Sequence, residues 1–173
     1  MTLPFEGGLL LLRNGVLTKK MPIVGEIFKY PKSDGNSPFQ ATNLLQEPLE
    51  IKPPQHINIW IPSLGVWYFM QSHPFVVTSW TGKKQTSLEL LIEPRHGWTK
   101  RLQSRAITAS GHSGGLGRVF FTGPHGISLP VDEYEYVFMV TSGYGIIPQL
   151  PLLERLVQGA LAHEARARRI RLV

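Results

Sequence analysis

The chain contains no cysteine, and this absence removes several classes of site at once. Without thiols there is no disulfide framework and no thiolate metal centre, and the redox compartment stays open. Six histidines are present, but they show no paired ligand spacing, and the only close carboxylates lack a matching partner. We therefore predict no metal site. A serine nucleophile is equally unsupported, because no serine lies in a G-x-S-x-G turn.

The chain also lacks a hydrophobic run long enough to cross a membrane. The longest leucine run, Leu9 to Leu12, is followed at once by Arg13 and is far shorter than the roughly 20 apolar residues that a spanning helix needs. The start of the chain has no basic region before its apolar stretch and no small-residue cleavage site. We therefore expect neither a transmembrane segment nor a signal peptide in this chain.

Charged residues are sparse and unevenly signed, with 18 Lys and Arg against 12 Asp and Glu, which gives a net charge of +6. That excess suits an anionic ligand, nucleic acid or a membrane surface, and it does not choose among them. Near the C-terminus, Glu164 is the single acid beside four arginines, which are Arg166, Arg168, Arg169 and Arg171. We interpret these arginines as the solvated end of a helix, since cations favour helix C-termini.

Glycine and proline are abundant, at 17 and 14 residues, which favours short strands joined by turns over a helical bundle. Between residues 21 and 126, short apolar or alternating runs predict strands at residues 25–30, 44–51, 56–61, 74–80, 86–93 and 117–122. Strands at this spacing predict a small antiparallel barrel. Residues 97–103 contain no internal breaker and predict a short helix that crosses one end of that barrel.

After Pro130 the pattern becomes that of an α/β fold. Residues 136–140 form a continuous apolar run, typical of a strand buried on both faces. A helical stripe follows at Leu150, Leu153, Val157 and Leu161, with Leu152, Leu156 and Ala160 beside it, and a further strand can begin at Arg169. We expect a barrel domain over residues 1–130, with its core at about 21–127. The incomplete start of a second domain would occupy residues 131–173.

Residues 73–79, with the sequence HPFVVTS, form the first candidate binding segment. Pro74 cannot donate to a sheet ladder, so it marks a strand start or edge where the chain can meet a ligand. Alternation along the strand would let an aromatic or a hydroxyl group face that ligand. The candidate residues are His73, Pro74, Phe75, Val76, Thr78 and Ser79. Taken alone, the segment also fits an ordinary barrel strand with a satisfied histidine at its mouth.

The second candidate segment is Gly97, Trp98 and Thr99, at the predicted start of the cross-barrel helix. An exposed helix start offers unpaired backbone N–H groups and a positive dipole end, which suit a pyrophosphate, and Lys100 and Arg101 add positive charge nearby. Taken alone, the segment also fits a capping threonine and a core tryptophan.

Two glycine-containing turns complete the candidate set. Gly123 and Gly126 follow the sixth predicted strand and would permit close backbone approach to a cofactor, although a simple tight turn explains them as well. Residues 141–148 form a glycine loop between a predicted strand and a predicted helix, with Pro148 suited to the first helical position. Its candidate residues for a dinucleotide pyrophosphate are Ser142, Gly143, Gly145 and Pro148.

In their order along the chain, five segments resemble the cytosolic half of the ferric reductase and NADPH oxidase family, with fungal ferric-chelate reductases most similar. The segments are residues 52–62, 71–80, 97–99, 123–126 and 141–148, and the likeness runs from about Arg13 to Val173. The resemblance implies a mainly β fold with an α/β tail. In detail, it implies a six-stranded antiparallel Greek-key FAD-binding barrel, followed by the first β-α-β unit of a ferredoxin reductase-like, nicotinamide-binding domain.

The resemblance also implies roles for the candidate residues. Residues 73–78 would line the flavin and its ribityl chain, residues 97–99 would lie near the FAD pyrophosphate, and residues 143–148 would bind NADPH. In that family, hydride passes from NADPH to FAD, and electrons then pass singly to haems in an attached transmembrane domain and on to ferric iron. The implied location is the cytosolic face of the plasma membrane, in electron and iron transport. No catalytic residue is assigned.

The chain departs from the family pattern by what it does not contain. The haem-bearing membrane helices are absent, as are the later nicotinamide-domain segments with their cysteine-glycine motif and 2′-phosphate contacts. We therefore expect FAD binding, a partial NADPH site and no full activity from this chain alone. Two alternatives stay open: a non-catalytic basic β-barrel binding module, and an inactive truncated product with an exposed sheet edge. The resemblance itself implies no nucleic-acid partner.

Overall fold

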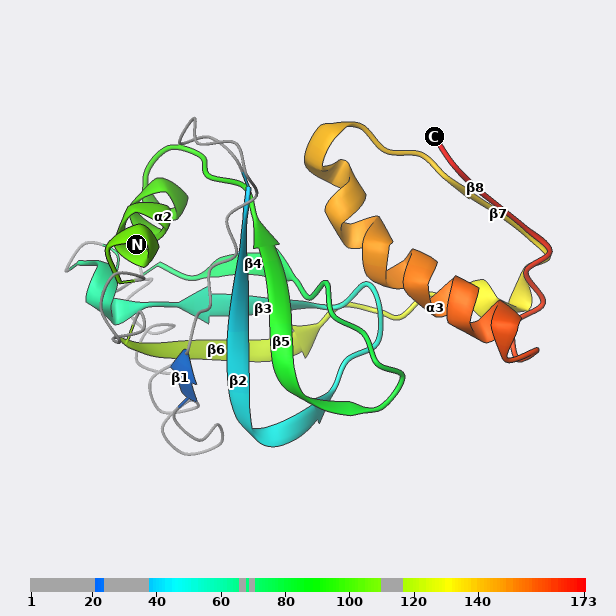
Figure 1. Ribbon diagram of the computed structural model, residues 1–173, viewed down its shortest axis with the longest axis horizontal. Coiled ribbons are helices and arrows are strands. Elements are labelled where there is room, and N and C mark those ends of the chain that lie inside the picture. The colour runs from blue at the N-terminus through cyan, green and yellow to red at the C-terminus, as the bar shows by residue number, and fades with distance from the viewer. Residues whose placement is uncertain (1–20, 24–37, 66–67, 69–70, 110–116) are drawn as a thin grey trace, which may run out of the picture.

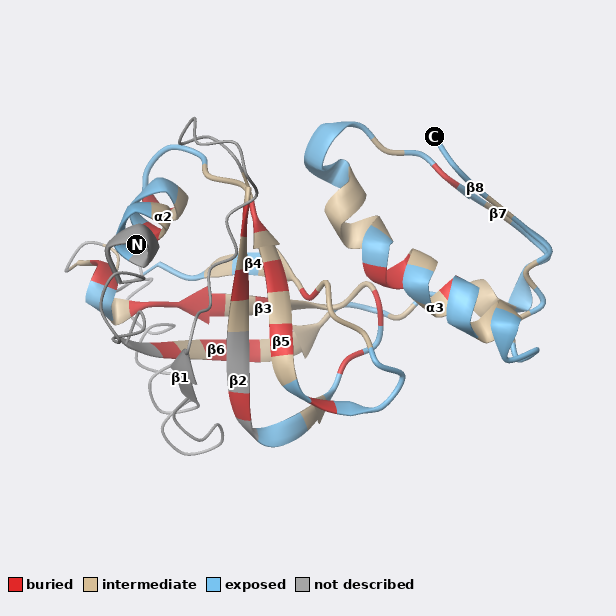
Figure 2. Cartoon of the chain, viewed as in Figure 1, coloured by how far each residue is buried: buried red, intermediate tan, exposed pale blue. Residues whose placement is uncertain are grey.

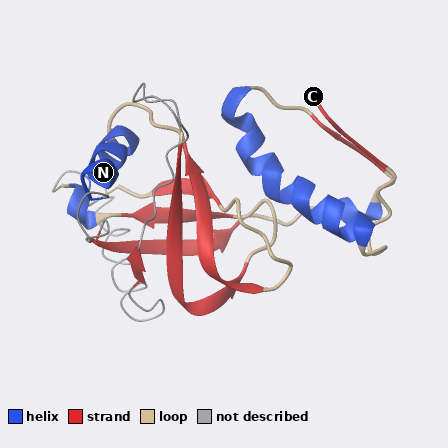
Figure 3. Cartoon of the chain, in the orientation of Figure 1, coloured by secondary structure: helices blue, strands red, loops and turns tan. Residues whose placement is uncertain are grey.

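A computed structural model describes residues 21–23, 38–65, 68, 71–109 and 117–173 of the chain. Figure 1 shows a β-structure with a helix at one end, next to a smaller part that holds a long helix and the C-terminus. We refer to the first part as the barrel and to residues 131–173 as the C-terminal unit. Figure 3 shows the same division as mostly strands in the barrel and mostly helix in the C-terminal unit.

The barrel is built from antiparallel strands in two sheets. The strands are β1 (Met21–Ile23), β2 (Phe39–Glu50), β3 (His56–Trp60), β4 (His73–Val76), β5 (Lys84–Ile92) and β6 (Gly117–His125). One sheet has the order β1-β6-β3-β4 and the other pairs β2 with β5. An isolated bridge between Val77 and Leu90 connects the end of β4 to β5, and β1 lies next to β2. The resulting circular order β1-β2-β5-β4-β3-β6 confirms the predicted mainly β, Greek-key class. The strand predicted at residues 25–30 lies outside the described residues.

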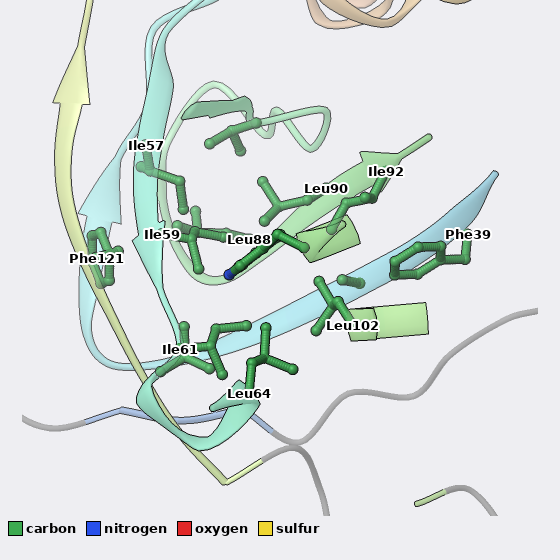
Figure 4. Close-up of a cluster of buried hydrophobic side chains, with 14 of the residues drawn as sticks. Phe39, Ile57, Ile59, Ile61, Leu64, Leu88, Leu90, Ile92, Leu102 and Phe121 are labelled. Atoms are coloured by element: carbon green, nitrogen blue, oxygen red, sulfur yellow. The ribbon is translucent and has the colours of Figure 1, made fainter. Parts of the chain in front are cut away.

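One hydrophobic core fills the barrel, and the period of its strands explains which residues form it. In β5, Leu88, Leu90 and Ile92 alternate with less buried residues and point inward. Ile57 and Ile59 do the same from β3, and Figure 4 shows these side chains converging with those of Phe39 and Leu102. Each buried Leu or Ile contributes about 1.5–3 kcal/mol relative to an exposed side chain. The core therefore holds the two sheets face to face.

Helix α2 (Trp98–Ala109) closes one end of the barrel, as the sequence predicts, but it extends beyond the predicted residues 97–103. Trp98 and Leu102 are four residues apart, so they share one helix face, and both are buried in the barrel core. Gly97 precedes the helix with a φ of 77°, a left-handed conformation that favours glycine. The packing of Trp98 and Leu102 into the barrel core therefore fixes the position of the N-terminus of α2.

The C-terminal unit forms the predicted β-α-β arrangement. It contains η3 (Val131–Glu133), β7 (Tyr136–Met139), η4 (Gly143–Gln149), α3 (Leu150–Leu161) and β8 (Arg169–Leu172). β7 and β8 are parallel, with Tyr136 opposite Arg169 and Met139 opposite Leu172. α3 packs Leu152 and Leu156 against Met139, in a hydrophobic cluster separate from the barrel core. The boundary near residue 130 stays a prediction.

Three details of the sequence-based prediction for this unit are wrong. The stripe expected to be buried on α3 includes Val157 and Leu161, which are 44% and 78% exposed, whereas the buried face is centred on Leu152 and Leu156. β7 is buried on one face only, because α3 covers a single side of the β7/β8 pair (Figure 2). Phe138 is 63% exposed. The C-terminal arginines do not end a helix. α3 stops at Leu161, and the arginines lie in the following loop and on β8.

Within the described residues, no helix is both long enough and apolar enough to span a membrane.

Candidate functional site

A cavity of about 570 Å³ lies where the barrel meets the C-terminal unit, between β4 and η4. We call it the interdomain cleft. Its lining brings together eight of the predicted site residues: His73, Pro74, Phe75, Val76, Thr99, Ser142, Gly145 and Pro148. These residues come from three separate predicted motifs that are distant in the sequence. The structure therefore places the strand motif, the helix start and the glycine loop around one space.

The barrel wall of the cleft is an aromatic surface on an edge strand. β4 is the last strand of its sheet, so Pro74 interrupts no ladder on the outer side. Behind this strand, the Trp98 ring lies 4.5 Å from the His73 ring and 5.7 Å from the Phe75 ring, measured between centroids, and is nearly parallel to Phe75. Because Trp98 is itself buried in the core, it holds both rings in place at the cleft.

The His73 imidazole is buried enough to change its protonation. Desolvation lowers the pKa of His73 below its ordinary value of 6.5, so the ring is neutral at physiological pH. Its Nε2 atom is buried and has no hydrogen-bond partner among the described residues, and the same holds for Nε1 of Trp98. Buried polar atoms in native proteins usually have a partner. These two nitrogens depart from that rule within the described residues.

The start of α2 offers donors to the same cleft. The Thr99 hydroxyl accepts a hydrogen bond from the Arg95 backbone N–H at 2.8 Å, which leaves the hydroxyl proton able to donate. The N–H groups of the first helical turn have no partner within the helix, and they carry the positive end of its dipole. Arg95 adds a guanidinium group that is 76% exposed and lies 2.8 Å from the Glu93 carboxylate. The cleft can therefore hold an anion at this corner.

The opposite wall is the glycine loop that leads into α3. Gly143 has a φ of 53°, and a Cβ at Gly145 would come within 3.0 Å of the Thr141 hydroxyl oxygen, so both positions favour glycine. That Thr141 oxygen is buried without a partner in the part of the chain that the structure describes. Pro148 lies inside the 3-10 helix η4, and Pro151 occupies the first turn of α3 instead. The predicted helix start at Pro148 is therefore wrong, because the loop first tightens into a 3-10 turn.

Other predicted site residues lie away from the cleft lining. The Thr78 hydroxyl donates to the Glu89 carbonyl oxygen, and the Ser79 hydroxyl oxygen accepts the Glu89 N–H, so both serve the junction between β4 and β5. Gly123 and Gly126 have positive φ, and both lie beside His56 at the far end of β6. Gly97 and Trp98 form the support behind the wall. Cofactor contacts at these positions stay predictions.

Five further residues also line the cleft. Tyr144 and Ile147 lie within the predicted segment 141–148, whereas Leu91, Glu93 and Arg95 were not predicted from the sequence. Arg95 stands only two residues before Gly97, so its proximity to the motif was a usable signal. Arg101, which was predicted to add charge near the phosphates, stacks over the Tyr68 ring at 5.6 Å and is not part of the lining. Of the described α2 residues, Thr99 alone contributes to the cleft lining, whereas Arg101 lies on another face of the helix.

Known protein families and curated proteins include relatives of this chain. The FAD-binding domain family matches residues 42–129, which is half of the chain. Ferric/cupric reductase transmembrane component 2 of Saccharomyces cerevisiae is 32% identical over 99 residues, or 57% of this chain. Ferric reductase transmembrane component 3 of the same yeast is 33% identical over 95 residues, or 55% of the chain. Each match spans 13% of the relative's length. These matches confirm the resemblance to fungal ferric reductases.

Solved structures share the fold. Phthalate dioxygenase reductase matches 89% of this chain and 42% of its own, with a TM-score of 0.61 and 13% identity. A ferredoxin NADP+ reductase from Neisseria gonorrhoeae, with bound FAD and NADP, matches 89% of this chain and 55% of its own, with a TM-score of 0.60 and 15% identity. The likeness extends over both the barrel and the C-terminal unit and confirms the ferredoxin reductase-like fold. By its family match, this chain belongs to the FAD-binding domain family.

Proposed function

We propose that this chain is the FAD-binding part of a ferric-reductase-like oxidoreductase that passes electrons from NADPH through FAD towards haem and ferric iron. One observation carries the proposal: the interdomain cleft opposes the aromatic β4 wall to the glycine loop across a single space. A protein that moves hydride between two cofactors needs two such sites held in fixed relation. When bound, FAD would supply a centre that accepts two electrons as hydride and releases them one at a time.

The residues of the cleft fit FAD by their chemistry. Phe75 and His73 offer aromatic surface for a flavin ring, and the buried His73 Nε2 lacks a partner in the described part of the chain. The N–H groups at the start of α2, the Thr99 hydroxyl and the Arg95 guanidinium suit a pyrophosphate. The two sets of groups would act separately, since the aromatic side chains would orient the ring and the donors would anchor the phosphates.

We assign Ser142, Gly143, Gly145 and Pro148 to the pyrophosphate of NADPH. η4 continues into α3, so the loop lies at the amino end of a helical segment, where anions are favoured. The β7/β8 pair supplies one β-α-β unit, whereas a dinucleotide extends along several strands of such a sheet. The NADPH site of this chain is accordingly partial, in keeping with a domain boundary near residue 130.

The names of the yeast relatives, which are transmembrane reductase components, support a wider assembly. In that assembly the barrel would work at the cytosolic face of the plasma membrane, beside a haem-bearing transmembrane domain. Electrons leaving FAD would reach ferric iron through that domain.

The proposal is tested by titrating the purified chain with FAD and following flavin absorbance and fluorescence quenching. Saturable binding is expected. A parallel titration with labelled oligonucleotides at several salt concentrations separates the proposal from a basic binding module. Salt-sensitive oligonucleotide binding without flavin affinity would replace the flavin proposal by the module, since phosphate-driven binding weakens steeply with salt.

A further inference from the structure

The two halves of the cleft belong to bodies that share little packing. The barrel core and the cluster around Met139, Leu152 and Leu156 are separate. Among the described elements, no barrel strand packs extensively against η4, α3, β7 or β8. Relative motion is the default for two bodies joined in this way, unless an interface restrains it. The width of the cleft therefore depends on a small number of specific contacts.

Arg155 on α3 makes several polar contacts to residues 128–132, the part of the chain that leads from β6 to β7. Its guanidinium donates to the Ser128 hydroxyl at 2.9 Å and to the Leu129 carbonyl oxygen at 3.5 Å, and it pairs with the Asp132 carboxylate. The Arg155 side chain is 22% exposed and that of Asp132 is 31% exposed, so solvent screens this pair less than a surface pair. Arg155 thus joins α3 to residues 128–132.

Ser128 carries the connection on to the barrel. Its hydroxyl accepts from Arg155 and donates to the Pro53 carbonyl oxygen at 3.2 Å, and Pro53 is fully buried at the turn between β2 and β3. A second barrel contact lies close by, where the Gln55 amide donates to the Gly126 carbonyl oxygen at 3.3 Å. One hydroxyl group therefore connects a helix of the C-terminal unit to the rigid part of the barrel.

The geometry of α3 relates this connection to the cleft. Arg155 lies about 9 Å along the helix axis from Gln149, the last residue of η4, at 1.5 Å per residue. A helix of this length is stiff, so a rotation at Arg155 moves the glycine loop relative to β4. We propose that Arg155, through Ser128 and Asp132, is a positioning residue that sets the separation between the flavin wall and the nicotinamide loop. This role rests on the proposed function of the two walls.

The absence of cysteine allows a direct test with two spin labels. Thr86→Cys on β5 and Leu161→Cys at the end of α3 are exposed labelling positions, one in each body. Double electron–electron resonance on the labelled chain should give a single narrow distance distribution. Arg155→Met, which keeps side-chain length without donors, should broaden it by about twofold or more, since the restraint on domain motion is removed.

Matched variants separate positioning from general destabilisation. Arg168→Met removes a charge from an exposed site in the same unit and should leave the width unchanged. Arg155→Lys keeps the pairing with Asp132 and should recover part of the narrow distribution. Ser128→Ala should broaden it and should add little to Arg155→Met, because residues in one network are not additive. The helical circular dichroism signal of Arg155→Met should match that of the parent, which shows that the variant is folded. Its FAD dissociation constant should stay within about twofold of the parent's, since Arg155 is not part of the cleft lining.

An unchanged width in Arg155→Met would overturn the role of Arg155. If that variant fails to fold, Ser128→Ala decides the question, and an unchanged width there overturns it equally. The flavin proposal fails separately, if the parent chain does not bind FAD while its distance distribution still responds to Arg155.

Discussion

At the scale of single residues, the cleft contains buried polar atoms that have no partner among the residues the structure describes. His73 is the clearest case, because the Trp98 ring lies 4.5 Å from its ring at a tilt of 34° and burial lowers its pKa. The sequence predicted His73 as a site residue but not its neutral state, since that state follows from burial, which depends on packing with residues distant in the sequence. Arg95 was missed for a related reason: its place in the cleft follows from the turn before α2, which sequence patterns locate poorly.

The lowered pKa of His73 predicts a pH-dependent stability. The unfolded imidazole takes up a proton near its ordinary pKa of 6.5, whereas the folded one resists it. The unfolded state therefore binds more protons as pH falls, and stability that is present above 6.5 is lost as pH falls from there towards the lowered pKa. We expect the urea concentration at the midpoint of unfolding to decrease when the pH is lowered from about 7.5 to about 5.5. The decrease should be smaller in His73→Gln.

His96→Gln is the matched control, because His96 is exposed just before α2. An equal pH response in the parent and in His73→Gln, with FAD absent, would contradict the assigned burial.

Thr99 predicts an effect on FAD affinity. Thr99→Val keeps the shape of the side chain but removes the hydroxyl that can donate to a phosphate. We expect FAD binding to weaken by about 1–3 kcal/mol, the range for leaving a charged acceptor unpaired. The measurement is a fluorescence-quenching titration.

Thr86→Val, on an exposed position of β5, makes the same chemical change outside the cleft and should leave affinity unchanged. Equal affinities for the parent and Thr99→Val would place the phosphates elsewhere.

At the scale of elements, the strands followed their sequence period more closely than α3 did. From Leu88 to Ile92, buried and less buried residues of β5 alternate as the strand period requires, although buried Gln85 breaks the alternation nearer the start of the strand. α3 carries apolar residues almost all around its axis, so periodicity alone could not select the face that meets β7. The partly exposed β7 could not be predicted for a similar reason: its burial depends on which elements cover the sheet.

The element that anchors phosphate in our proposal is α2, and its start depends on Gly97. A Cβ at Gly97 would meet no atom within 4 Å, so substitution adds conformational strain without a clash. We expect Gly97→Ala to destabilise the chain by roughly 1–2 kcal/mol in chemical denaturation, the penalty for a left-handed residue with a Cβ. Gly97→Asn should be milder, because asparagine tolerates that conformation. Equal stability of Gly97→Ala and the parent would contradict the left-handed start of the helix.

At the scale of the whole molecule, the order of motifs predicted the architecture better than any single motif did. The segments at residues 73–79 and 141–148 each fitted an ordinary strand or loop, and only their common order indicated two facing sites. The sequence could not indicate that Arg155 on α3 bonds Ser128 and Asp132, since these residues come together only when the chain between β6 and β7 packs against α3. Contacts of this kind emerge only when both bodies are in place.

Our proposal of a partial nicotinamide site predicts weak use of NADPH by this chain alone. The described C-terminal unit provides one β-α-β unit, and hydride transfer depends strongly on positioning. We expect reduction of bound FAD by NADPH, followed at the flavin absorbance band under anaerobic conditions, to be slow or absent. Dithionite should reduce the same flavin fully, which shows that it is competent. Rapid, saturable reduction by NADPH would mean that these 173 residues hold a complete nicotinamide site.

The central claim is that the cleft binds FAD through both an aromatic wall and a phosphate corner. The most direct test is one calorimetric titration series of the purified chain with riboflavin, FMN and FAD. We predict that FAD binds most tightly and riboflavin most weakly, because each added phosphate meets donors at the start of α2 and Arg95. Equal affinities for the three flavins, or no binding by any of them, would contradict the account.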